Sequence, residues 1–466
     1  MERTYIGNAT EKIGQNVRLN GWIAVRRDHG KLIFFDLRDS TGLIQLVVNP
    51  KISPDAHKIS NEVRNEYVVQ IEGLVKNREE KLVNPNIPNG KIEIEVKDVI
   101  ILNKSQPVPF DISADGHEIK EEVRLKYRYL DLRRDRLQKN LRLRSEFINA
   151  ARKFLQKEGF LEIETPILSA PTPEGSRDFV VPSRLQPGKF FALPQSPQQY
   201  KQLLMVAGFE KYFQIAKCLR DEDLRSDRSF EHSQIDIEMS FVDRTGFMKL
   251  DEAMMISIAE HLGFKVLQKP FPVFTYKEAM EKFGADKFDL RSEKDKTNKV
   301  LAYAWVTDFP FFEKNDEGGW TFTHNPFSMP INEHIDWLIK GQQVEQILTT
   351  QYDLVCNGVE IGGGSIRAHK PEILQGTFKI MGYSEEKINK EFGHMIEALS
   401  FGAPPHGGIA HGIERNLMTL LGENFLRETQ AFPQTSSGKT AVMDAPADLT
   451  AKQLRELHLK IGKSAD

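Results

Sequence analysis

The sequence predicts an α+β protein with a small β-barrel followed by a larger domain in which strands and helices mix. Short segments of alternating apolar and polar residues fill 16–103. From about residue 131 onward, apolar residues at helical spacing are combined with a charged, hairpin-like stretch at 218–238. The chain has 466 residues, which is enough for two or three domains with a sizeable core.

The composition is that of a folded globular protein. Charged residues make up 28% of the chain and hydrophobic residues 40%. No segment approaches the roughly 18 apolar residues of a membrane span, and the first residues lack the apolar core of a secretion signal. Because Cys218 and Cys356 are the only cysteines, we expect neither a disulfide framework nor a zinc site, and we expect a cytoplasmic protein with no membrane partner.

The first element is the barrel, for which we expect residues 1–103. In "KLIFFDLRD", Ile33 and Phe35 share one face of a strand while Phe34 shares the other. In "LIQLVV", Gln45 points away from its apolar neighbours. Several short strands with one candidate helix, around 55–64, are typical of a small closed barrel. The net charge of −3 disfavours bulk nucleic-acid binding but allows a local binding surface.

Residues 104–130 are expected to link the two domains, since two prolines and a glycine interrupt the alternation. The chain then turns basic over 124–144. Apolar residues at helical spacing over 147–155 predict a helix that ends at Gly159, and "FLEIETPIL" follows as a strand up to Pro166. Residues 284–300 are almost wholly polar and are expected to form a surface excursion between packed elements.

The stretch "CLRDEDLRSDRSFEHSQIDIE" predicts two antiparallel strands joined by a charged loop. In the second strand Ile235 and Ile237 share one face, while Asp236 and Glu238 share the other. For an isolated hairpin, this pattern favours a solvated sheet face without a binding role. Three other segments favour a binding site: "GVEIGGGSIRAH", where glycines permit close approach of a ligand; "HGGIAHGIERNLMTLL", where an arginine follows a Gly-rich turn; and "LPQSPQQYKQLLM".

Together these segments resemble the class II aminoacyl-tRNA synthetases. "KEGFLEIETPILSAPTPEG", "CLRDED…FEHSQIDIE" and "GGIAHGIER" resemble the three class II motifs in order. "RRDHGKLIFFDLRD", "YRYLDLRRD" and "QYDLVCNGVEIGGGSIRAH" resemble the bacterial aspartyl-tRNA synthetases of subclass b, over nearly the whole chain. The resemblance implies an OB-fold at 1–103 and, at 131–466, a catalytic domain built on an antiparallel sheet flanked by helices. Residues 284–300 would be the remnant of a large insertion domain that bacterial members carry.

The resemblance implies an aspartate–tRNA ligase that first makes aspartyl-adenylate from aspartate and ATP and then transfers aspartate to tRNA. Positioning and electrostatics would do most of the work. The residues expected at the reacting centre are Arg220, Arg415 and Glu360. Those expected to bind aspartate are Glu174, Ser196, Gln198, Lys201, Arg220, Asp236, His324 and Arg367, with Arg367 gripping the side-chain carboxylate bidentately. Those expected to bind ATP are Arg220, Asp221, Glu222, Ser229, His232, Glu360, Gly412, Ile413, Glu414 and Arg415.

The same resemblance implies Mg²⁺ on Asp353 and Glu360, and a homodimer with tRNA as partner. On the barrel it implies that the anticodon is read by Arg26, Arg27, His29, Phe34, Gln45 and Glu93. The sequence departs from the family at His232, where a phenylalanine usually stacks on adenine, at His411 in the third motif, and at Asn325, where many members have a second histidine.

Several alternatives remain open. His29 favours the relaxed kind of aspartyl enzyme, which charges tRNA-Asn as well as tRNA-Asp, over the strict kind. A lone loop histidine without any role is also consistent with the sequence. An asparaginyl or lysyl enzyme is disfavoured by Lys201 with Arg367, which would repel lysine. A catalytically silent tRNA-binding paralogue is disfavoured because Arg220, Glu360 and Arg415 are all present, and a tRNA-independent ligase because the barrel is present.

Overall fold

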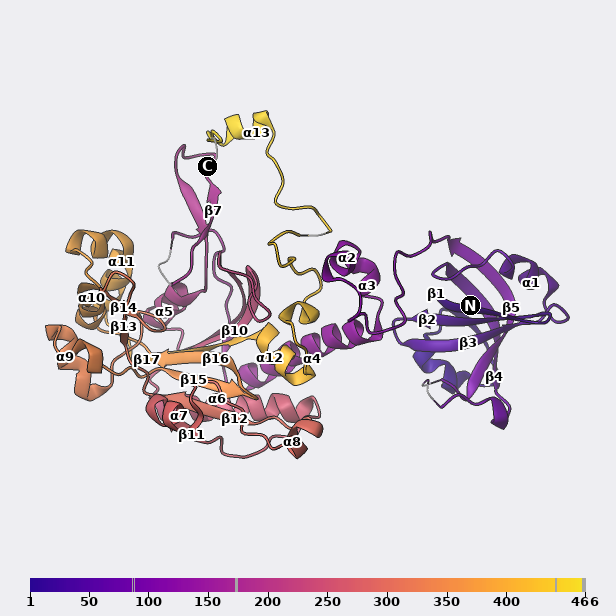
Figure 1. Ribbon diagram of the computed structural model, residues 1–466, viewed down its shortest axis with the longest axis horizontal. Coiled ribbons are helices and arrows are strands. Elements are labelled where there is room, and N and C mark those ends of the chain that lie inside the picture. The colour runs from indigo at the N-terminus through magenta and orange to yellow at the C-terminus, as the bar shows by residue number, and fades with distance from the viewer. Residues whose placement is uncertain (86, 88, 172–174, 441, 463–466) are drawn as a thin grey trace. The chain divides into compact units, whose positions relative to one another are not determined.

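The computed structural model describes residues 1–466 except 86, 88, 172–174, 441 and 463–466, and the chain forms two compact units (Figure 1). The first unit is Met1–Ile119 and the second is Lys120–Asp466. Among the described residues no helix combines the length and apolar character needed to cross a membrane.

The first unit is a closed five-stranded barrel with the strand order β1-β2-β3-β5-β4, as the sequence predicts. Among the barrel strands of the described residues, β3 and β5 pair in parallel and the other neighbours are antiparallel. Ile33, Phe35 and Leu37 point into the barrel and are at most 3% exposed, while Phe34 lies on the outer face with Gln45. The elements are η1 (Ile6–Lys12), β1 (Asn16–His29), β2 (Leu32–Asp39), β3 (Gly42–Val48), α1 (Pro54–Ser60), β4 (Val68–Asn77), η2 (Glu80–Leu82) and β5 (Ile92–Asn103).

The second unit is organised around an eight-stranded sheet with the order β11-β12-β15-β16-β17-β10-β9-β6. The six central strands are antiparallel, as expected, but the two edge strands pair in parallel, so the sheet is mixed. Its strands are β6 (Leu161–Glu162), β9 (Lys211–Leu219), β10 (Glu231–Ser240), β11 (Val273–Thr275), β12 (Tyr303–Thr307), β15 (Tyr352–Cys356), β16 (Val359–Ile366) and β17 (His406–Gly412). Two small hairpins accompany it: β7 (Phe179–Pro182) with β8 (Phe190–Leu193), and β13 (Phe312–Lys314) with β14 (Trp320–Phe322).

Helices α4, α6 and α12 cover one face of this sheet (Figure 1), because their apolar stripes join the inward-facing strand residues in one core. Phe147 and Leu155 of α4 are buried there at 1% exposure, which agrees with the helical spacing in the sequence. A second cluster joins α9, α10 and α11. The helices are α2 (Glu121–Lys126), α3 (Arg128–Asp131), α4 (Asp135–Lys157), α5 (Gln198–Val206), α6 (Arg244–His261), α7 (Tyr276–Phe283), α8 (Glu293–Thr297), η3 (Asn332–His334), α9 (Ile335–Lys340), η4 (Val344–Gln346), α10 (Pro371–Ile380), α11 (Glu385–Ser400), α12 (Ile413–Leu421), η5 (Leu426–Thr429) and α13 (Ala451–Glu456).

Two expectations about the second unit need correction. The strand predicted from "FLEIETPIL" is only two residues long: after Leu161–Glu162 pair with β9, the chain leaves the sheet before Pro166. Residues 284–300 are not purely a surface excursion. Phe288 is 6% exposed and packs against Phe274 and Phe283 of the α7 region, and α8 forms within the segment.

The end of the range expected to be a linker is part of the second unit. Helices α2 and α3 carry Arg124 and Asp131, which are buried in a network with Glu428 of η5. Arg124 donates to both carboxylates, with its Nη2 at 3.0 Å from Asp131 and 2.9 Å from Glu428. The basic composition of 124–144 therefore reflects, in large part, structural arginines rather than a free cationic surface.

Candidate functional site

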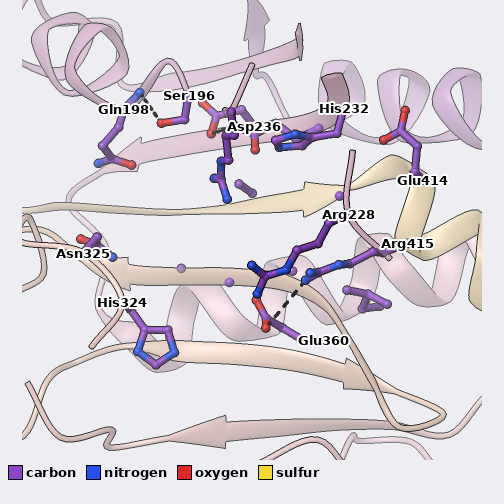
Figure 2. A pocket seen from close by; sticks show the side chains of 18 of the residues that line it. Ser196, Gln198, Arg228, His232, Asp236, His324, Asn325, Glu360, Glu414 and Arg415 are labelled. Atoms are coloured by element: carbon purple, nitrogen blue, oxygen red, sulfur yellow. Dashed lines mark hydrogen bonds and ion pairs between the residues drawn. The ribbon is translucent and has the colours of Figure 1, made fainter. Parts of the chain in front are cut away.

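A polar pocket of about 290 Å³ lies on the second unit, on the sheet face that carries the side chains of Asp236 and Arg367. The alternation of β10 decides this: Asp236 and Glu238 point to the pocket side, while Ile235 and Ile237 join the core behind the sheet. In Figure 2, Ser196, Gln198, His324 and Asn325 lie toward one end of the pocket, and His232, Glu360 and Arg415 lie toward the other.

The pocket brings together most of the residues that the sequence singles out. Its lining includes Ser196, Gln198, Lys201, Arg220, Glu222, Ser229, His232, Asp236, His324, Glu360, Arg367, Gly412, Glu414 and Arg415. Asp221, Asp353 and Ile413 do not line it. Glu174 lies outside the described residues.

At the first end of the pocket, two cations and two carboxylates form a buried cluster. Lys201 at the start of α5 places its Nζ 2.6 Å from Asp236 Oδ1 and 3.3 Å from Glu238 Oε2. Burial raises the pKa of Asp236, although Lys201 opposes that rise. Burial would also raise the pKa of Glu238, but Arg367 and Lys201 outweigh it and hold this pKa below its ordinary value. The cluster is thus closely paired before any ligand enters.

The expected bidentate grip of Arg367 on a ligand does not fit this arrangement. Arg367 Nε and Nη2 already bind Glu238 at 2.9 and 3.1 Å, Nη1 donates to Ser365 at 2.8 Å, and Nη2 donates to the Gly408 carbonyl at 3.2 Å. These bonds use four of the five guanidinium N–H groups. One N–H from Arg367 and the remaining ammonium proton of Lys201 are the donors left for a carboxylate.

The rim of this end consists of amides, hydroxyls and an imidazole. The Ser196 hydroxyl accepts from the backbone N–H of Gln198, the first residue of α5, at 3.2 Å, and Gln198 Nε2 donates to Gln202 at 3.1 Å. His324 Nε2 lies 3.3 Å from Asp353 Oδ2. Burial would lower the pKa of His324, but the Asp353 carboxylate raises it above its ordinary value.

The second end of the pocket is dominated by arginines. Arg220, at the end of β9, has a buried Nε with no hydrogen-bond partner among the described residues. Arg415, in the first turn of α12, lies 3.2 Å from Asp227 and 3.9 Å from Glu360. Arg228 lies 3.4 Å from Glu222. Arg220 therefore has an open donor, and Arg415 lies at a helix start, and both features favour binding of an anion.

His232 shares the end of the pocket with these arginines. Burial lowers its pKa to about 3, and the neighbouring charges of Arg220 and Arg415 act in the same direction. The imidazole is therefore neutral at ordinary pH. A neutral aromatic ring in this place is suited to stack on a base and does not add to the positive charge.

Several residues expected to bind the nucleotide have structural contacts instead. Ile413 is completely buried in the core behind the sheet, so its side chain cannot reach a ligand. Glu414 lines the pocket but accepts from the Ser233 backbone N–H at 2.9 Å and pairs with Arg144 at 2.9 Å. The Ser229 hydroxyl donates to Gln434 at 3.0 Å. Asp221 lies outside the lining and pairs with Arg177 at 3.5 Å.

The two carboxylates expected to hold Mg²⁺ differ in availability. Among the described residues there is no group of three or more His, Cys, Asp or Glu side chains suited to a metal ion. Asp353 is buried, with its oxygens engaged by Gln351 at 2.7 Å and His324 at 3.3 Å. Glu360 faces the pocket, and Lys287 and Arg415 hold its pKa below the ordinary value although burial acts upward.

The outer face of the barrel carries a separate polar cluster. Gln45 Nε2 donates to Glu93 Oε2 at 3.1 Å, and Arg27 binds Asp36 through both terminal nitrogens at 2.6 and 2.7 Å. Phe34 lies half-buried on this face. Arg78, which the sequence reasoning missed, lies 3.7 Å from Glu93 and has a buried Nη2 with no partner among the described residues.

Arg26 does not belong to this polar cluster on the outer face of the barrel. Its Nη1 donates to the carbonyls of Ser60, Asn61 and Val63 at 2.8–3.1 Å, so it fixes the end of α1. That Arg26 helps to read the anticodon stays a prediction, and in this structure its Nη1 is engaged by backbone carbonyls. His29 is exposed and is the last residue of β1, beside the tight turn to β2, rather than part of a longer loop.

Comparison with known proteins decides the family. The family described as tRNA synthetases class II (D, K and N) matches residues 120–436, and the OB-fold nucleic acid binding domain matches 17–102. The aspartate–tRNA ligase of Staphylococcus saprophyticus is 38% identical over 583 aligned positions, covering 98% of this chain and 99% of the relative. The chain belongs to the aspartate–tRNA ligase family of class II synthetases. The aspartate–tRNA(Asp/Asn) ligase of Bacillus subtilis is 39% identical, with 98% of each chain covered.

Solved structures of class II synthetases share the fold. A putative aspartyl-tRNA synthetase from Leishmania major superposes with a TM-score of 0.75 at 20% identity, covering 93% of this chain and 94% of the other. An asparaginyl-tRNA synthetase from Pyrococcus horikoshii, complexed with asparaginyl-adenylate, gives 0.73 at 23% identity, covering 93% and 98%. The alignments with the aspartate–tRNA ligases span 583 or 584 positions against 466 residues here, so this member of the family is a shortened form.

The sequence reasoning assigned no role to Glu238, which lies on the pocket side of β10 in this aspartate–tRNA ligase fold. It is completely buried and binds both Arg367 and Lys201. The signal was present, because Glu238 follows Asp236 at the spacing that places both on one strand face. Asp227 and Gln351 also line the pocket, but they lie in loops, where no period indicates their direction.

Proposed function

We propose that the chain attaches L-aspartate to tRNA in an ATP-dependent reaction that passes through aspartyl-adenylate and releases pyrophosphate. The observation that carries this proposal is the division of the pocket into two ends. Lys201 and Arg367 offer donors for a carboxylate at one end, and Arg220 and Arg415 offer cations for phosphates at the other. The identity to aspartate–tRNA ligases supports aspartate as the amino acid.

Within this proposal the chain acts by positioning its substrates. Lys201, with Asp236 as its partner, and Arg367 bind the side-chain carboxylate, while Ser196 and Gln198 lie on the ammonium side and His324 lies over the substrate. Arg220 spans the α-phosphate and the reacting carboxylate. Arg415 binds the far phosphates, Glu222 and Gly412 contact the nucleotide, and neutral His232 stacks on adenine. Donors fixed in advance at developing charge lower the barrier without further reorganisation.

Magnesium fits this site as a companion of ATP. Mg²⁺ commonly binds through one or two carboxylates together with substrate phosphates and water. Glu360, which faces the pocket, suits such a ligand, whereas Asp353 has both oxygens engaged and contributes less directly. The ion would supply charge neutralisation for the phosphates.

The test is ATP–pyrophosphate exchange with aspartate and, separately, with asparagine. We expect exchange with aspartate and little with asparagine. Equal exchange with both amino acids would contradict the assignment of the first end of the pocket. Absence of exchange with either, in protein that binds ATP, would favour a silent paralogue.

The tRNA specificity is proposed to be relaxed, so that tRNA-Asp and tRNA-Asn are both charged. The Asp/Asn names of relatives from Bacillus subtilis and Geobacillus support this proposal. His29 is exposed at the end of β1, on the same strand as Arg27, where it can meet an anticodon base. Charging purified tRNA-Asp and tRNA-Asn with wild type and His29→Leu tests it, because one-base discrimination is worth about 1–3 kcal/mol. If wild type ignores tRNA-Asn, the enzyme is strict.

We also propose a homodimer, with the segment around β6 at the two-fold interface. Leu161, Ile167 and Leu168 are each 52% exposed, and a cluster of exposed apolar side chains favours an interface. Light scattering at micromolar concentration tests this proposal. A monomer with full activity would contradict it.

A further inference from the structure

Lys287 has no role in the site so far, yet it reaches one of that site's carboxylates. It lies in the segment 284–300, between α7 and β12. Its Nζ is 2.8 Å from Glu360 Oε2, and Arg415 Nη1 is 3.9 Å from the same oxygen. Two cations from distant parts of the sequence therefore converge on one carboxylate oxygen at the phosphate end of the pocket.

The backbone of Lys287 is held firmly. The next residue, Phe288, stacks on Phe283 with ring centres 4.0 Å apart and meets Phe274 edge-on at 5.4 Å. Asp289, which is two residues after Lys287, accepts from Arg291 through both carboxylate oxygens at 2.8–3.2 Å. In contrast, the Lys287 side chain is 45% exposed. A fixed backbone with an accessible ammonium is a suitable arrangement for a group that changes partner when a ligand binds.

A further cation at the end of the pocket that holds Arg220 and Arg415 would add to the charge available for phosphates. ATP brings a polyphosphate with several negative charges, and Arg415 already shares its guanidinium between Asp227 and Glu360. An ammonium has three donors, so Lys287 can keep Glu360 and bind a phosphate oxygen at the same time. It is also a compact charge that suits phosphate without requiring planar geometry.

We propose that Lys287 is a substrate-binding residue whose ammonium contacts the terminal phosphates of ATP, and the released pyrophosphate, beside Arg415. This inference rests on the proposed function for the identity of the nucleotide. It assigns a role at the reacting site to the segment where the longer relatives are expected to carry their insertion domain. The opposing explanation is that Lys287 acts only through Glu360, by neutralising its charge.

Lys287→Met, Lys287→Arg and the control Lys294→Met separate these explanations. Lys294 lies on α8 of the same segment, is exposed, and has no ion pair among the described residues, so its replacement removes the same charge away from the pocket. In ATP–pyrophosphate exchange, Lys287→Met should raise KM for ATP and for pyrophosphate about tenfold, the value of one charge-assisted hydrogen bond. KM for aspartate should stay within about twofold in that variant. Lys287→Arg should raise KM for ATP less than Lys287→Met does, and Lys294→Met should stay near wild type throughout.

Calorimetric binding of inorganic pyrophosphate gives the second measurement, in a Glu360→Gln background. If Lys287 contacts pyrophosphate directly, Glu360→Gln/Lys287→Met binds it about tenfold more weakly than Glu360→Gln alone. Equal binding by these two variants would overturn the proposal, as would an equal KM rise in Lys294→Met. If wild type shows no aspartate-dependent exchange, the proposed function fails, while the pyrophosphate comparison still decides the role of Lys287.

Discussion

The second unit contains two clusters of buried charged side chains that are similar in composition. They differ in whether all their hydrogen-bond donors and acceptors have partners. In the first, Arg124, Asp131 and Glu428 are all at most 7% exposed, and their charged groups bond to one another at 2.9–3.2 Å. In the second, the pocket, Asp236 Oδ2 and Arg220 Nε are buried without a hydrogen-bond partner among the described residues. Both clusters bury charge. Of the two, it is the pocket cluster whose described residues include buried donors and acceptors without hydrogen-bond partners.

This difference separates a structural network from a binding site. A buried polar atom without a partner costs free energy, so it is retained where a ligand completes its bonding. A closed network needs no ligand, and its removal affects the fold. Variants in the two clusters should therefore change different quantities.

The largest effect is expected for Asp131→Asn. Asp131 accepts from Arg124, Arg128 and Arg134 at 2.7–3.2 Å, so the substitution leaves buried arginines incompletely paired. The free energy of unfolding should fall by about 3–5 kcal/mol. Denaturant unfolding checks this, and KM for ATP in the remaining folded protein should be unchanged. A large rise in KM for ATP with unchanged stability would contradict the structural role of this network.

The same network predicts an acid limit. Burial acts to raise the pKa of Asp131, but hydrogen bonds from Arg124 and Arg134 outweigh it and lower the pKa below the ordinary 3.8. A lowered carboxyl pKa contributes stability above 3.8 that is lost as pH falls through the folded value. The stability difference between wild type and Asp131→Asn should thus be full near pH 7 and shrink below pH 3.8. A difference that is constant with pH would show that the charge is not responsible.

Arg220→Ala should have the next largest effect, on catalysis alone. Arg220 has no ion pair among the described residues, so its removal leaves no carboxylate unpaired. The turnover number for adenylate formation should fall about 10²–10³-fold, as for removal of one positioned donor. Its melting temperature should match wild type. If stability falls instead, Arg220 belongs with the closed network.

His411→Phe tests an intermediate case, because one ring nitrogen of His411 has no hydrogen-bond partner among the described residues although the residue does not line the pocket. Its Nε2 lies 2.6 Å from Asp251, and its Nδ1 has no partner among the described residues. Leaving Asp251 alone in the core should cost about 1–3 kcal/mol of unfolding free energy. His411→Phe/Asp251→Leu should recover most of it, as measured by thermal unfolding. Failure of the double variant to recover would mean that packing, rather than the pair, is at stake.

The smallest effect is expected for His232→Phe. Because His232 is neutral, the change keeps the charge and adds aromatic area for stacking, worth about 0.5–1.5 kcal/mol. KM for ATP should fall severalfold, and KM for aspartate should not change. A rise in KM for ATP would mean that the imidazole donates or accepts a hydrogen bond that phenylalanine cannot replace.

Alternation and helical spacing along the chain were enough to predict the barrel, the main helices and the strand faces of the pocket. Alternation is a local property, so it correctly placed Phe35 inside and Phe34 outside, and it aligned Asp236 with Glu238 on one face of β10. Motif order indicated the family, which the comparisons show. Individual side-chain roles on irregular backbone were not predictable in this way.

Which partner each charged side chain takes depends on the tertiary structure. Arg26 and Arg27 are adjacent and chemically identical, yet Arg26 fixes the end of α1 while Arg27 remains 48% exposed beside Asp36. In the sequence, Lys287 is one of several lysines in a polar segment. In the structure, Phe288 packs beside it and Lys287 contacts Glu360. Such outcomes depend on partners that are distant in sequence, and hydrogen bonds between distant residues are set by how the elements pack rather than by any local period.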